Sequence, residues 1–126
     1  MMNRVAAAGA AAILAAIALG GADALAVDTF QKLKGSQIQT RFAGMEMTDE
    51  VHWGDVYERD GTLKTYSMGH KITGKWWVQK DELCVDRGKE FKGCYEVWIS
   101  GKKVELRRGA SSLPLEGVLQ KPIDPK

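Results

Sequence analysis

The pattern of apolar and polar positions changes twice along the chain. The first 26 residues are almost entirely apolar, the segment Asp28–Gly35 has helical spacing, and from Ser36 onward apolar and polar residues alternate. Alternation of this kind is typical of strands that bury one face. The pattern therefore predicts an all-β domain preceded by one short N-terminal helix.

The alternating segments predict about eight short strands, with turn signals about every 8–12 positions. The strongest hairpin signal is the pair Asp60-Gly61. The predicted strands are Gln37–Phe42, Val51–Glu58, Leu63–Met68, Lys71–Gln79, Glu82–Asp86, Gly93–Ile99, Val104–Arg108 and Leu115–Gln120. Sequential antiparallel strands form an up-and-down meander, and we expect it to close into a small lipocalin-like barrel because closure removes exposed edges. An open sandwich is the alternative.

The apolar start of the chain has the layout of a secretory signal peptide. A short positive segment, Met1–Arg4, precedes the apolar run Val5–Gly21, and small residues stand at Ala24 and Ala26. We predict cleavage after Ala26, with export to the periplasm. The alternative is an uncleaved anchor, but a run of about 17 weakly hydrophobic residues is at the lower limit for spanning a bilayer.

The remaining chain is long enough for one domain. We place the barrel at residues 27–121 and a proline-containing tail at residues 122–126. No second apolar run of spanning length follows, so no stable membrane insertion is expected after cleavage. The net charge of +2, with acidic and basic residues mixed throughout, argues against a protein that binds nucleic acid by neutralising phosphates.

The two cysteines, Cys84 and Cys94, are expected to form a disulfide, because an even pair in an exported chain is normally oxidised. Their spacing fits a hairpin whose loop is Arg87–Phe91. The same register pairs Lys80 with Trp98 and sets Glu82 against Glu96, a like-charge pair. A reactive thiol pair or metal ligation is disfavoured because no C-x-x-C spacing is present.

The aromatic residues suggest one binding surface. Trp76 and Trp77 are adjacent, so on a strand they must point to opposite faces. We expect Trp76 in the core and Trp77, with Thr73 and Lys75, as an outer patch that binds a partner.

The densest group of acids with a histidine is Glu50, His52 and Asp55, which is the alternative polar site. We weigh a weak metal-dependent protein or an enzyme centred on His52 as the alternative function. However, no metal-ligand spacing is diagnostic, and no serine stands in a nucleophile motif. We therefore expect no catalytic residue, no metal and no cofactor.

Several short motifs recur along the predicted strands and turns: Tyr57–Leu63, Gly74–Val78, Leu83-Cys84, Gly93–Tyr95, Gly101–Val104 and Gly117. In these motifs the chain resembles a group of small exported, lipocalin-like barrel proteins of Gram-negative bacteria. The resemblance implies a barrel fold and a periplasmic location but no active site. A more distant similarity, through Gly74-x-Trp76 and the following Cys84, is to the periplasmic inhibitors of metalloproteases, although there the G-x-W strand opens the barrel.

Taken together, these patterns predict a periplasmic binding or interaction module that is not an enzyme. Its ligand is expected to be a small apolar molecule or a protein partner, in an inhibitor-like or envelope-associated role. Four Trp and three Tyr are available to fill a small barrel, which favours recognition on the surface over an internal ligand.

Overall fold

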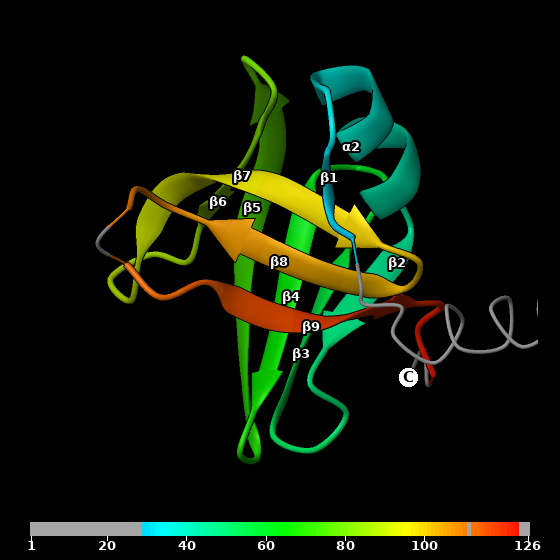
Figure 1. The fold of residues 1–126 in the computed structure, drawn as a ribbon. Coiled ribbons are helices and arrows are strands. Elements are labelled where there is room, and N and C mark those ends of the chain that lie inside the picture. The colour runs from blue at the N-terminus through cyan, green and yellow to red at the C-terminus, as the bar shows by residue number, and fades with distance from the viewer. Residues whose placement is uncertain (1–28, 111, 124–126) are drawn as a thin grey trace, which may run out of the picture.

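The computed structural model describes residues 29–110 and 112–123 as one antiparallel barrel with a helix at one end (Figure 1). The elements, in chain order, are β1 (Gln31–Lys32), α2 (Gly35–Phe42), β2 (Met45–Thr48), β3 (Trp53–Tyr57), β4 (Thr62–Ser67), β5 (His70–Gln79), β6 (Glu82–Asp86), β7 (Lys92–Ser100), β8 (Lys103–Arg107) and β9 (Leu115–Gln120).

The sheet closes because its last strand pairs with its first barrel strand. From β2 to β9 each strand is antiparallel to the next, and β9 returns to β2 with Met47 opposite Leu119. The predicted closed meander of eight strands is therefore confirmed, and the open sandwich is wrong. The Asp60-Gly61 turn also joins β3 to β4 as expected, with Gly61 at φ 95°.

The N-terminal elements differ from the prediction. The expected strand Gln37–Phe42 lies within α2. The helix expected at Asp28–Gly35 does not form in the described part of that segment, where Gln31 and Lys32 form β1. Ile38 and Phe42 satisfy both a period of two and the i, i+4 spacing of a helix, and the helix buries both completely. The alternation there was ambiguous, and tertiary packing decided in favour of the helix.

The start of α2 is fixed by side chains on either side of it. The Lys34 backbone N–H donates to Gln37 Oε1 at 2.8 Å, and the Gly35 N–H donates to Asp81 Oδ1 at 2.7 Å. Asp81 belongs to the turn between β5 and β6, so this bond ties the helix to the barrel. Gly35 therefore begins the helix, whereas we expected it to end one.

The first barrel strand, β2, was not predicted, and β3 is shorter than expected. Residues 49–52 form a turn, because Asp49 Oδ1 accepts hydrogen bonds from the backbone N–H groups of Val51, His52 and Trp53 at 2.7–3.0 Å. Met45–Thr48 then supplies the eighth barrel strand in place of the segment that became α2.

The cysteine hairpin has the predicted register throughout the β6–β7 pairing, from Leu83 to Asp86, but the pairing does not extend to Lys80. Cys84 lies opposite Cys94, and Arg87–Phe91 is the connecting loop. Lys80 does not pair with Trp98, because Lys80 lies in a turn and Trp98 instead pairs with Lys32 of β1. The expected pairing of Glu82 with Glu96 is also absent, since Glu96 instead pairs with Arg107 of β8 and forms an ion pair with Lys32 at 3.4 Å.

The core fills the barrel and continues under α2. Phe42 meets Tyr57 edge to face, with ring centroids 5.1 Å apart, and Tyr57 meets Trp76 in the same way at 5.5 Å. The Trp76 indole N–H donates to the Glu58 carbonyl at 2.7 Å, so the buried polar atom of this ring is satisfied. The helix thus acts as an apolar lid on one end of the barrel.

Two predictions fall wholly or partly outside the described residues. The signal peptide, residues 1–26, lies outside them, and so does the end of the tail, residues 124–126. In the part of the chain that the structure does describe, no helix has the length and apolar character needed to cross a membrane.

Candidate functional site: an outer groove at the loop end of the barrel

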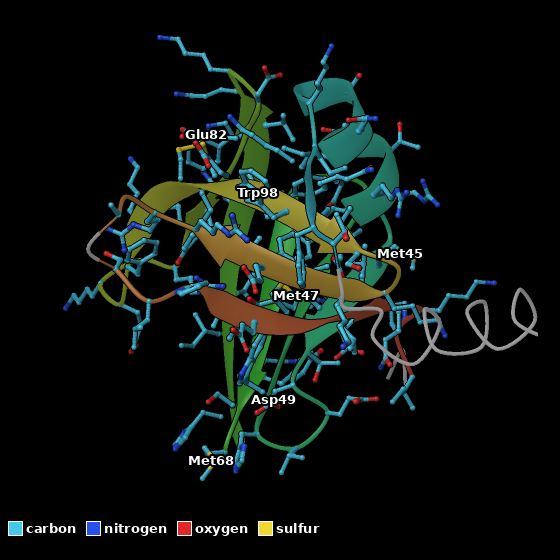
Figure 2. The ribbon with its side chains drawn as sticks, in the orientation of Figure 1. Met45, Met47, Asp49, Met68, Glu82 and Trp98 are labelled. Carbon is cyan, nitrogen blue, oxygen red and sulfur yellow. A yellow bond between two sulfur atoms is a disulfide. The ribbon has the colours of Figure 1, made fainter. Side chains whose placement is uncertain are left out.

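The disulfide forms as predicted, on the outer wall of the barrel. Cys84 and Cys94 are bonded with an S–S distance of 2.06 Å. Leu83 and Val85 are fully buried in the core, so alternation along β6 turns Cys84 to the opposite face. In Figure 2 the yellow disulfide lies beside Glu82. The bond joins two neighbouring strands on the face of the sheet away from the barrel interior, where Cys84 is itself 0% exposed.

The two adjacent tryptophans separate as expected. Trp76 is 4% exposed and lies in the core, whereas Trp77 is half-buried on the outer face of β5. Thr73 and Lys75 are exposed on that same outer face. The Trp77 indole N–H donates to Gln79 Oε1 at 3.0 Å. The geometry of this patch is as predicted, and its binding role stays a prediction.

The alternative polar site does not assemble. Asp55 is 1% exposed and points into the barrel, whereas Glu50 and His52 are exposed in the turn after β2. His52 Nδ1 lies 2.9 Å from Asp49 Oδ2, so its nearest acid is one the sequence did not single out. Among residues 29–110 and 112–123 no three His, Cys, Asp or Glu side chains lie close enough together to hold a metal ion.

Asp55 instead belongs to a buried ion pair. Its Oδ2 pairs with Arg87 Nη2, and its Oδ1 accepts from the Thr65 hydroxyl at 2.8 Å. Arg87 Nε also reaches the Thr65 hydroxyl at 3.3 Å. Burial raises the pKa of the Asp55 carboxyl, although the positive charge of Arg87 opposes this shift. The cluster ties β3, β4 and the loop after β6 together inside the barrel.

One polar atom beside this cluster has no partner. The Tyr57 hydroxyl is buried and has no hydrogen-bond partner in the described structure. Burial raises the pKa of Tyr57 well above its ordinary value, and the negative charge of Asp55 adds to that effect. Tyr57 therefore stays a neutral phenol, with its ring in the apolar lid and its oxygen toward the ion pair.

A groove of about 520 Å³ runs along the outer wall over β2, β3 and β4. Gly54 lies on its floor, between Thr48 of β2 and Tyr66 of β4, its partners in register. Four exposed apolar side chains line it: Val51, Tyr66, Met68 and Ile123. We call this feature the outer groove. Figure 2 shows Met68 at the tip of the β4–β5 hairpin, at the end of the molecule away from α2.

The walls of the outer groove are set by two tight turns. Met68 and Gly69 both have positive φ, 51° and 86°, as a two-residue hairpin turn requires. On the other side, the hydrogen bonds that Asp49 accepts hold Val51 outward at the tip of its turn. Desolvation acts to raise the pKa of Asp49, but these backbone hydrogen bonds and His52 outweigh it and lower that pKa well below its usual range. The turn is thus held by an ionised carboxylate.

The sequence offered a weak signal for this groove. An apolar residue at a turn tip has no core to enter, and both Val51 and Met68 are of this kind, 77% and 72% exposed. We had assigned both to strands, so their exposure was not anticipated. Ile123 joins them only because β9 closes against β2, which is a property of the whole barrel.

Comparison with known proteins gives no match, since no family model, curated protein or solved structure matches this chain. The resemblance to exported lipocalin-like barrels therefore stays a prediction. The barrel and the disulfide are the parts of that expectation that the structure itself bears out.

Proposed function

We propose that this protein is a non-catalytic, periplasmic binding module that docks an apolar side chain of a protein partner in the outer groove. One observation carries the proposal. Five large apolar side chains are exposed in the described part of the chain, and four of them surround this one groove. Single exposed apolar residues are ordinary, but a gathered set on a soluble domain marks an interaction surface.

The shape of the groove supports a protein partner over a small molecule. Sites for small molecules are concave and enclose most of their ligand. The outer groove is open along the barrel wall, whereas the inside of the barrel is occupied by side chains such as Met47, Tyr57 and Leu63, all 0% exposed. An open trough suits a side chain that is presented by another chain.

The floor supports the same role. Gly54 carries no side chain, so the Glu46 carboxylate can lie against the backbone of β3 between Thr48 and Tyr66. The floor of the trough therefore offers a hydrogen-bond acceptor to a bound segment of another chain.

The proposal is tested with a neutral apolar probe, N-acetyl-phenylalanine amide, titrated into ¹⁵N-labelled exported protein and followed by ¹H–¹⁵N NMR. Saturable shifts are expected at the amides of Gly54, Tyr66 and Gly69. The double variant Val51→Ser, Met68→Ser should lose these shifts. The matched control is Leu113→Ser, because Leu113 is 93% exposed but does not line the groove, and it should keep them.

Two outcomes would overturn the proposal. Shifts confined to Lys75 and Trp77 would move the binding site to the outer face of β5. Equal loss of binding in the Leu113→Ser control would show that binding of the probe depends only on the total exposed apolar area of the protein.

A further inference from the structure

The acidic side chains of the outer groove bear on the chemistry of its partner, and the argument rests on the proposed function. The Glu46 carboxylate lies over Gly54, so that a Cβ at position 54 would overlap Glu46 Oε2 and stand 3.3 Å from its Cδ. The glycine at 54 thus makes room for the carboxylate at the floor of the outer groove.

Glu46 has little within residues 29–110 and 112–123 to neutralise it. Its one hydrogen bond to these residues comes from Gln120 Nε2, at 3.5 Å, the limit for such a contact. Within the described residues no lysine or arginine forms an ion pair with it. By contrast, Glu58, Glu96 and Glu105 each pair with a basic side chain. Glu46 therefore retains its capacity to accept hydrogen bonds from a cation.

The lining of the groove is acidic although the whole chain has a net charge of +2. Glu46 and Glu50 both line it, and in the part of the chain described no lysine or arginine does. His52 is the one basic side chain there, and Asp49 faces it at 2.9 Å. A cationic group on a ligand would meet carboxylates without a competing positive charge.

We infer that the outer groove recognises a segment of a partner protein in which a lysine or arginine is adjacent to a large apolar side chain. The apolar side chain lies between Tyr66 and Met68, and the cation reaches Glu46 at the floor. Hydrogen bonds between an ionised donor and an ionised acceptor are stronger than neutral ones. The carboxylate therefore adds selectivity for a cationic segment, whereas the apolar contact alone distinguishes poorly between partners.

Three capped dipeptides test this inference, Ac-Lys-Phe-NH₂, Ac-Ala-Phe-NH₂ and Ac-Glu-Phe-NH₂, each titrated into the exported protein by NMR. We expect the lysine peptide to bind about fivefold more tightly than the alanine peptide, as a partly exposed ion pair allows. The glutamate peptide should bind most weakly. In Glu46→Gln the three affinities should converge, whereas the control Glu90→Gln, in the loop after β6, should preserve their order.

The outcomes separate this inference from the proposed function. If all three peptides shift the groove amides with equal affinity, the inference about charge is overturned and the apolar site remains. If none shifts them, both fail. If the same amides shift with protein concentration in the absence of peptide, the occupant is a second copy of this chain, and the inference is likewise overturned.

Discussion

The two ends of the barrel are closed in different ways. At one end α2 covers the barrel with apolar contacts, among them the edge-to-face series Phe42, Tyr57 and Trp76. At the other end, where the turns after β2 and β4 lie, the interior holds the Asp55–Arg87 ion pair and the surface carries the outer groove. The apolar end is built for stability, and the loop end combines internal charge with exposed apolar side chains.

This difference shows where the molecule can carry function. A buried ion pair contributes less to stability than an apolar contact of the same volume, because both charges lose their hydration. Apolar surface that stays exposed to water adds no hydrophobic stabilisation to the fold. Folding therefore does not explain the exposed apolar side chains of the outer groove, and our proposal assigns them to recognition.

The largest effect is expected at the apolar end. Phe42→Ala removes a completely buried ring from the helical lid, which should lower the free energy of unfolding by about 3–5 kcal/mol. Urea unfolding followed by tryptophan fluorescence measures this. Leu113→Ala, at an exposed site, should change it by less than about 0.5 kcal/mol. A small effect of Phe42→Ala would mean that the helix is not part of the cooperative core.

The ion pair at the loop end gives the next effect. Arg87→Met leaves the Asp55 carboxylate buried without its partner, which should cost about 3 kcal/mol. The double variant Asp55→Leu, Arg87→Met should recover most of that loss, because an apolar pair replaces a desolvated one. If the double variant were less stable than either single variant, the ion pair would be a net source of stability and the contrast between the ends would fail.

The disulfide should contribute about 2–3 kcal/mol, since it closes a short loop between residues 10 apart in sequence. Cys84→Ala with Cys94→Ala is expected to lower stability by that amount. The barrel should still fold, because β6 and β7 also pair through their backbones. Circular dichroism and urea unfolding of the double variant measure both points, and loss of the strand signal would contradict them.

Two carboxylates of the loop end should respond to pH in opposite directions. The pKa of Asp49 is lowered in the folded state, so its stabilisation is present above its unfolded value of 3.8 and is lost as the pH falls through the folded value. The pKa of Asp55 is raised, so its contribution is greatest below 3.8 and is lost as the pH rises through the folded value.

Urea midpoints measured between about pH 2 and pH 7 separate these two groups. Asp49→Asn should weaken the loss of stability toward acid, and Asp55→Asn should weaken the loss toward neutral pH. Identical profiles for the two variants would show that the two sites do not differ in environment.

The strands from β3 to β9 and the disulfide could be predicted from the sequence because each depends on local pattern. Alternation predicted β5 closely, and the cysteine pair predicted its own register with Leu83 opposite Tyr95. The helix that contains Ile38 and Phe42 could not be predicted from the sequence, because its apolar spacing fits a helix and a strand equally. Only packing against the end of the barrel selects the helix.

The site was less accessible, because it depends on closure of the barrel. Glu50, His52 and Asp55 are close in sequence, yet the strand and its preceding turn send them to opposite sides of the wall. Conversely, Glu46 and Gln120 are distant in sequence and meet in the outer groove because β9 pairs with β2. No local sequence pattern predicts such a contact.

The most direct test of the central claim is Gly54→Ala, with stability and binding measured on the same sample. Its new methyl group meets the flexible end of Glu46 rather than backbone, so the free energy of unfolding should stay within about 1 kcal/mol of the native value. The affinity for Ac-Lys-Phe-NH₂ should fall about tenfold, because the floor is filled and the carboxylate displaced. Unchanged affinity in this variant would contradict the assignment of the outer groove as the binding site.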